Sequence, residues 1–275
     1  MGKRPNSRVN LDRAIQRIFG RNVVFLEIRD LMANAIIGQF LPHGVVKGGS
    51  ALKLRYGKAH TRVTTDLDAA YSENLEIFIS ELEQALRKGW EGFTGMVIRR
   101  EPAKPAGVDP AYVMQPYSVK LAYNTQPWCT VELEVSYNEI GDADEADFDL
   151  SPDVSDIFTK LGFPEPGKIP LMPLAYQVAQ KLHGVSEPGS KRAHDLVDLQ
   201  LIVLNSPIDY AKLRTICVRL FAYRRKQSWP PTVFVGKDWS ERYDAEKLDL
   251  PVLPTVAEAT RWVNEFIAKI DGSTC

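Results

Sequence analysis

The spacing of apolar residues predicts a chain that begins with helices and continues with strands and helices in alternation. Apolar side chains recur every three or four positions in the segments 11–19 and 23–41, as they do on one face of a helix. This pattern stops at Pro42-His43-Gly44, where proline and glycine end helices. Helical spacing returns in the segments 75–86, 174–185, 193–204, 210–222 and 256–270.

Short apolar runs between these segments predict strands, at 45–46, 61–69, 96–100, 117–123 and 130–135. A short helix is expected over 50–57, with Ser50 as its N-cap and Gly57 at its end. The acidic segment 141–156 is interpreted as a solvated loop. The pattern therefore indicates an α/β domain over 1–150 and a helical domain over 151–275.

Composition excludes some classes of protein and leaves others open. The 275 residues are 44% hydrophobic and 25% charged, as in a soluble globular protein, and the net charge is −1. Any contact with nucleic acid must therefore come from a local basic patch. Cys129, Cys217 and Cys275 have no metal-like spacing and are expected to be reduced thiols in a cytoplasmic protein. No signal-peptide core or membrane span is expected.

The strongest chemical signal is a glycine pair followed, after a short helix, by two aspartates. Free N–H groups at Gly48-Gly49-Ser50, where a helix begins, suit phosphate oxygens. In a strand, Asp66 and Asp68 would share one face, where paired carboxylates suit Mg²⁺. Either motif alone could be an ordinary turn or a solvated acidic pair. In this order and spacing, they indicate a nucleoside triphosphate site.

A third carboxylate is needed beside such a pair for a site with two metal ions. The alternating run 131–135 places Glu132 and Glu134 on one strand face and the apolar residues on the other. The alternative is an ordinary amphipathic strand with one solvent-exposed face.

These motifs resemble the first motif of the DNA polymerase β-like nucleotidyltransferases, and more narrowly the AbiEii/AbiGii toxin family, a group that includes the MenT toxins of mycobacteria. That signature reads Gly-Gly-Thr-Ala-Leu, then Arg-x-Ser-x-Asp-Leu-Asp. This chain has Ser50 where threonine is common and Thr64 where serine is common. The resemblance implies a mixed sheet in the first domain and a helical second domain that completes the active-site cleft.

The resemblance also implies roles for residues further along the chain. Asp66, Asp68 and Glu134 would hold metal, and Lys181 would bind phosphate. Thr64 would be a regulatory phosphorylation site; the alternative is an ordinary strand hydroxyl. A later family block, Arg-x-x-Lys-Asp-x-x-Asp, is matched by Lys191, His194, Asp195 and Asp198, with His194 in place of lysine.

Asp195 is a catalytic candidate that could orient Lys181 or a metal-bound water; the alternative is an acidic face of a surface helix. Lys47 and Arg62 flank the first motif and are expected to reach the triphosphate, although either could be a solvated charge. A basic cluster at the end of a helix is a candidate RNA-binding surface, unless it only complements the helix dipole. It consists of Arg219, Arg224, Arg225, Lys226 and Trp229.

The function implied by the resemblance is that of a Mg²⁺-dependent toxin of a toxin–antitoxin system. It would transfer a nucleotide from an NTP to RNA, at the 3′ acceptor end of tRNA, and so block translation. The expected partners are an NTP, the RNA and a cognate antitoxin, and the protein is expected to be a cytoplasmic monomer. The alternatives are a nucleotidyltransferase that modifies a small molecule or a protein hydroxyl, and a degenerate nucleotide-binding module.

Overall fold

The structure of the chain, a computed structural model, describes residues 3–103 and 113–273. These residues form two compact units. The N-terminal unit contains the residues up to 58 together with 64–172, and the C-terminal unit contains 59–63 and the residues from 173 onward. The chain therefore passes briefly through the C-terminal unit at Ala59–Val63 before it enters that unit a second time at Pro173.

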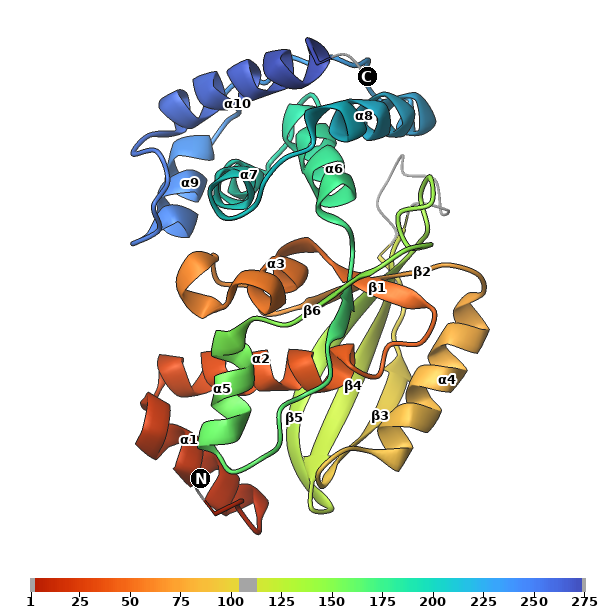
Figure 1. Cartoon of the computed structure of the whole chain (residues 1–275), viewed down its shortest axis with the longest axis vertical. Helices are drawn as coiled ribbons and strands as arrows, with labels where there is room; N and C mark the ends of the chain where they lie inside the picture. Colours follow the sequence, from red (N-terminus) through yellow and green to blue (C-terminus); the bar gives the residue numbers. More distant parts are fainter. Residues whose placement is uncertain (1–2, 104–112, 274–275) are drawn as a thin grey trace. The chain divides into compact units, whose positions relative to one another are not determined.

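Within the described residues, a seven-stranded sheet forms the centre of the N-terminal unit (Figure 1). Its strand order is β3-β4-β5-β2-β1-β7-β6. The pairs β1–β7 and β2–β5 are parallel and the other neighbours are antiparallel, so the α/β class with a mixed sheet is confirmed. The strands are β1 (Gly44–Lys47), β2 (Leu67–Tyr71), β3 (Phe93–Arg99), β4 (Gln115–Tyr123), β5 (Gln126–Tyr137), β6 (Asp147–Asp149) and β7 (Ile169–Leu171).

The helices of this unit bury the apolar face of the sheet. On β5, Val131, Leu133 and Val135 are buried, whereas Glu132 and Glu134 between them are exposed, as the alternation predicts. Helices α1 and α2 pack against β5, and α4 packs along β3 (Figure 1). The helices are α1 (Arg8–Phe19), α2 (Val23–Gly38), α3 (Gly48–Tyr56), α4 (Leu75–Lys88) and α5 (Pro152–Lys160), with a 3-10 turn, η1, at Lys58–His60.

The C-terminal unit is helical. Its helices are α6 (Leu174–Ser186), α7 (His194–Asn205), α8 (Tyr210–Arg224), α9 (Trp239–Lys247) and α10 (Val256–Asp271). Helix α6 packs against α7 and α8, while α9 and α10 pack against α7. Side-chain caps define two of the helix starts: Asp209 accepts a hydrogen bond from the Lys212 N–H of α8, and Thr255 accepts one from the Glu258 N–H of α10.

Two predictions around the glycine pair are wrong. Ser50 is not an N-cap, because α3 begins at Gly48, directly after β1. Gly48 has a φ of +67°, and a Cβ there would collide with the Asp68 carboxylate, so only glycine permits this direct strand-to-helix turn. A strand over 61–69 is also wrong, because β2 begins only at Leu67. The preceding residues 59–63 leave the sheet and pack in the C-terminal unit.

Some elements gave too weak a signal to be predicted. The strands β6 and β7 are three residues long, too short to show a period. Helix α9 is polar and buries only Trp239 and Tyr243. The segment 141–156 is more than a solvated loop: it contains β6 and the start of α5. Its Asp142 is buried and accepts a hydrogen bond from the Glu139 N–H, and its Asp147 pairs with Arg55 at 2.9 Å.

The structure describes two of the three cysteines. Cys129 and Cys217 are free thiols, and Cys275 lies outside the described residues. Burial raises the pKa of the Cys129 thiol to about 12, so this thiol is unreactive at neutral pH.

Across the described part of the chain, no helix combines the length and the apolar character that crossing a membrane requires.

Candidate functional site

The start of α3 holds the segment that carries the first aspartate. Ser50 is buried, and its hydroxyl donates a hydrogen bond to the backbone carbonyl of Asp66. One turn later, the buried Lys53 ammonium lies 3.5 Å from the carbonyl of Thr64. The Ser50 side chain is therefore occupied in fixing the aspartate segment, and the N–H groups at the helix start are the atoms that could meet a phosphate.

Asp68 and Glu134 lie opposite each other on the parallel strands β2 and β5. Residues in register on neighbouring strands project from the same face, with the strands about 4.8 Å apart. Lys47 of β1 lies opposite Asp68 on its other side. The register therefore places Glu134, and not Glu132, opposite Asp68.

Asp66 lies one residue before β2, so it does not share a regular strand face with Asp68. The expectation of an i, i+2 pair within one strand is wrong in this respect. Leu67 between the two aspartates is buried, as expected. The Thr64 hydroxyl donates a hydrogen bond of 2.8 Å to Asp66 Oδ1, which orients that exposed carboxylate.

The carboxylates suit a hard cation by their chemistry and their exposure. Glu134 and Asp66 are exposed, Asp68 is half-buried, and all three offer the oxygen ligands that Mg²⁺ prefers. Within the described residues, no three His, Cys, Asp or Glu side chains converge closely enough to enclose a metal ion. Carboxylates of this kind can share a bound cation with substrate oxygens and water.

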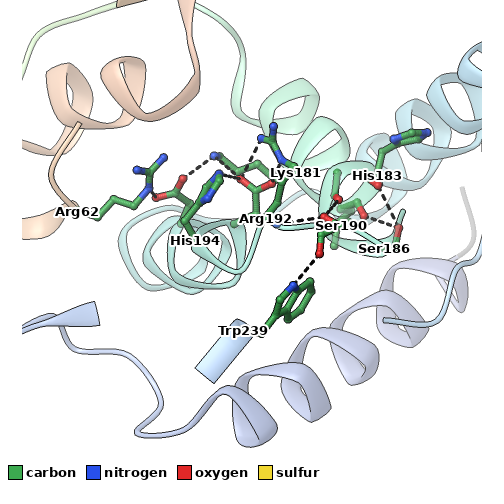
Figure 2. A network of polar contacts seen from close by, with 12 residues as sticks. Arg62, Lys181, His183, Ser186, Ser190, Arg192, His194 and Trp239 are labelled. Atoms are coloured by element: carbon green, nitrogen blue, oxygen red, sulfur yellow. Dashed lines mark hydrogen bonds and ion pairs between the residues drawn. The ribbon is translucent and has the colours of Figure 1, made fainter. Parts of the chain in front are cut away.

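The later motifs form a buried ionic network in the C-terminal unit (Figure 2). The Lys181 ammonium donates to Asp195 Oδ1 at 3.1 Å and to Asp198 Oδ2 at 2.6 Å. Arg62 Nε donates to Asp198 Oδ1 at 3.0 Å, and Arg192 Nε donates to Asp195 Oδ2 at 2.5 Å. The side chains of both aspartates are at most 1% exposed. Each carboxylate is thus shared between Lys181 and an arginine.

The electrostatics of this network keep Asp195 ionised. Burial alone would raise the pKa of Asp195, but Lys181 and Arg192 hold it well below its ordinary value. Burial would also lower the pKa of Arg62, but Asp198 and Glu246 raise it above its ordinary value. Burial lowers the pKa of His194, against the opposing effect of Asp195.

Arg192 is a residue that the motif comparison missed. The motif aligns Lys191 with the family arginine, but Arg192 is the residue whose guanidinium contacts Asp195. The spacing Arg192–Asp195, i to i+3 at a helix start, was the available signal. Ser190 also supports this turn, because its hydroxyl donates to the Gly184 carbonyl at 2.7 Å and accepts from the Arg192 N–H at 3.2 Å.

The basic cluster at the end of α8 is partly engaged with the rest of the C-terminal unit. Arg224 lies 3.4 Å from His183 Nδ1, and Lys226 lies 3.8 Å from Glu187. Trp229 is half-buried, donates to Asp271 at 2.9 Å and meets Phe221 edge to face. Arg219 and Arg225 have exposed side chains.

Comparison with known proteins agrees with these motifs. The family model described as "Nucleotidyl transferase AbiEii toxin, Type IV TA system" matches residues 29–264. A search of curated protein sequences gives no match. Among solved structures, the chain is similar to MenT4, a nucleotidyltransferase toxin from Mycobacterium tuberculosis H37Rv. The TM-score is 0.58 at 17% identity, covering 98% of this chain and 91% of MenT4.

The structural likeness confirms the expected nucleotidyltransferase fold, and the family match extends over most of the chain, including both groups of motifs. The protein is a nucleotidyltransferase that belongs to the AbiEii toxin family.

Proposed function

We propose that this nucleotidyltransferase toxin transfers a nucleotide from an NTP to the 3′ acceptor end of tRNA in a Mg²⁺-dependent reaction. The observation that carries the proposal is the alignment of Asp68 with Glu134 on adjacent strands, with Asp66 directly before β2. Carboxylates that are exposed and lie beside a glycine turn at a helix start suit a metal-bound triphosphate.

In this reaction the 3′ oxygen of the RNA forms a bond to the α-phosphorus, and the bond from that phosphorus to the β-phosphate oxygen breaks. Pyrophosphate leaves, and the hydroxyl proton passes to a carboxylate of the site. Asp66, Asp68 and Glu134 would hold Mg²⁺, which when bound neutralises the charge that develops on the phosphate oxygens. The Thr64–Asp66 hydrogen bond supports this role, because it fixes the direction of one ligand.

The triphosphate would lie against the N–H groups of Gly48, Gly49 and Ser50, with Lys47 as an adjacent cation. The positive φ of Gly48 supports this placement, because a side chain there would fill the space beside Asp68. Lys181 is proposed to contribute positive charge to phosphate binding, with Asp195 orienting it. Its two buried carboxylate partners support a fixed ammonium position.

RNA would dock through the basic cluster of α8. Exposed Arg219 and Arg225 support this role, because arginine forks bind phosphate oxygens. Trp229 is a weaker candidate for base stacking, because its ring already packs against Phe221. A cognate antitoxin is the partner that membership of a toxin family implies.

Thr64 is proposed as a regulatory phosphorylation site. A phosphate would add about −1.5 to −2 charges at a hydroxyl that now bonds directly to Asp66. That charge would repel both the carboxylates and an incoming triphosphate.

The test is incubation of the protein with total RNA and each labelled NTP in turn. Transfer to tRNA, lost when its 3′ end is oxidised with periodate, is the expected result. Equal labelling of oxidised tRNA, or labelling of protein or small molecules alone, would support the alternative acceptors. Nucleotide binding without release of pyrophosphate would support a degenerate binding module.

A further inference from the structure

The segment just before the catalytic aspartates belongs to a different unit from the aspartates themselves. Residues 59–63 pack in the C-terminal unit, while the residues on both sides of them belong to the N-terminal unit. Thr64 follows this segment directly, and Asp66 comes two residues later. Thr64 and Asp66 thus follow directly on residues that belong to the other unit.

One side chain in this segment forms a buried ion pair. Arg62 Nε lies 3.0 Å from Asp198 Oδ1, and Arg62 Nη1 lies 3.7 Å from Glu246. The Arg62 side chain is 14% exposed and that of Asp198 is 1% exposed. Figure 2 shows Arg62 directed into the network that also contains Lys181 and Arg192.

The partner of Arg62 is itself held in place. Asp198 accepts a hydrogen bond of 2.6 Å from Lys181 through its other oxygen, and Lys181 also bonds to Asp195. Asp198 lies on α7, and both of its carboxylate oxygens accept hydrogen bonds. It can therefore hold a loop residue in a fixed position.

A triphosphate would have to compete with these carboxylates for the guanidinium. If Arg62 turned toward a phosphate, Asp198 would lose a partner inside the protein, and uncompensated buried charge is costly. The present contacts also keep the guanidinium protonated, because Asp198 and Glu246 raise the pKa of Arg62 against the effect of burial.

We propose that Arg62 is a positioning residue, whose ion pair with Asp198 anchors residues 59–63 and thereby fixes the segment that carries Thr64 and Asp66. This role rests on the proposed use of Asp66 in nucleotidyl transfer. It replaces the phosphate contact that the sequence suggests for Arg62. An anchor of this kind acts on the geometry of the reacting groups and not on the affinity for nucleotide.

The first experiment compares Arg62→Ala with Arg62→Lys. The alanine variant should lower kcat by about ten- to a hundredfold, as small displacements of catalytic groups do. Its KM for NTP should change by less than about twofold, since no ground-state contact with the nucleotide is lost. Arg62→Lys should recover most of the activity, because lysine keeps a cation beside Asp198.

A second experiment places Arg62→Ala in an Asp198→Asn background. If the two residues act through each other, Arg62→Ala should lower kcat much less in that background than in the wild type. Lys58→Ala is the matched control: Lys58 lies just before the segment and pairs with Glu27 near the surface. This control should leave kcat and KM unchanged.

Hydrogen exchange gives a readout that needs no substrate. The backbone amides of 59–66 should exchange faster in Arg62→Ala than in the wild type, and Lys58→Ala should not show this change. If Arg62→Ala does not fold, Arg62→Gln replaces it in every comparison.

The outcomes separate this inference from the proposed function. A raised KM for NTP with unchanged kcat, or equal costs of Arg62→Ala in both backgrounds, would show that Arg62 binds phosphate and would overturn the inference. If the wild type transfers no nucleotide to any acceptor, the proposed function fails instead. The proposed role of Arg62 is then tested by hydrogen exchange alone, and unchanged exchange over 59–66 overturns it.

Discussion

The protein contains two groups of charged residues from its family motifs. The two groups differ in burial and in the balance of positive and negative charge. Asp66, Asp68 and Glu134 in the N-terminal unit are exposed or half-buried and all carry negative charge. In the C-terminal unit, Lys181 and its two aspartates are buried, and each negative charge there faces positive ones.

This difference separates exposed acids that are open to new ligands from buried residues whose contacts with one another also stabilise the fold. A group of exposed carboxylates can take a cation and a substrate. In a buried and balanced network, removing one member leaves an uncompensated charge inside the protein. We therefore expect substitutions in the first group to affect activity and those in the second group to affect stability first.

The largest effect is expected for Asp66→Ala. Loss of one carboxylate from the proposed metal site should reduce nucleotide transfer by about 10³-fold or more. The melting temperature should stay the same or rise, because the substitution relieves repulsion among exposed acids. Transfer of labelled nucleotide and thermal unfolding measure the two effects.

Glu81→Ala provides the control for this experiment, since Glu81 is an exposed acid on α4. It should retain full activity. An active and folded Asp66→Ala protein would remove the carboxylate site from the mechanism.

Lys181→Met should lower the stability of the fold, in contrast to Asp66→Ala. It leaves two buried aspartates without their shared cation, which we expect to destabilise the fold by about 3–5 kcal/mol. Urea unfolding at neutral pH measures the change. Lys226→Met is the control, because the Lys226–Glu187 pair is exposed and should be worth at most about 1 kcal/mol. Equal stability of the two variants would contradict the division between the two groups.

Thr64→Glu tests whether charge beside Asp66 switches the enzyme off. The threonine hydroxyl lies 2.8 Å from Asp66 Oδ1, so a carboxylate there would face a like charge at close range. We expect activity to fall by about a hundredfold, because the added charge would repel both Asp66 and the triphosphate. Stability should fall by at most about 1 kcal/mol, because Asp66 is exposed to water. Thr64→Ser keeps the hydrogen bond and should stay active. Full activity of Thr64→Glu would remove the regulatory proposal.

Reversal of Arg224 and Arg225 to Glu should raise KM for RNA by about tenfold and flatten its dependence on salt. KM for NTP should not change, because neither residue is proposed to contact the triphosphate. The same charge change at Arg242 and Arg261, exposed on α9 and α10, is the control. If both double variants behave alike, the end of α8 is not a specific docking surface.

The sequence was most informative where a residue's role follows from a local pattern. Alternation around Leu133 predicted the buried and exposed faces of β5, and the glycine pair predicted a strand-to-helix turn. The need for a third carboxylate beside the aspartates pointed to the run 131–135, and Glu134 of that run lies opposite Asp68.

It failed where long-range contacts decide the local conformation. Residues 61–66 have the composition of a strand, but Arg62 gains a buried partner 136 positions away, and the strand begins later. The start of β2 therefore depends on tertiary packing as well as on local composition. Arg192 was overlooked for a different reason: its i, i+3 spacing to Asp195 is a local signal, but the family motif pointed to Lys191 instead.

The smallest expected effect concerns His183, a buried histidine beside the basic cluster. Burial, together with the charges of Arg224, Lys226 and Arg192, lowers its pKa from 6.5 to about 4. The unfolded chain therefore takes up this proton at a higher pH than the folded protein does. The stability contributed by neutral His183 is complete above about pH 6.5 and is lost as the pH falls toward 4. In His183→Gln, the free energy of unfolding should fall less between pH 7 and pH 5 than in the wild type. His43→Gln, at an exposed position, should keep the wild-type dependence. Identical pH profiles for His183→Gln and the wild type would show that burial and the surrounding cations do not lower the pKa of His183 in the folded protein.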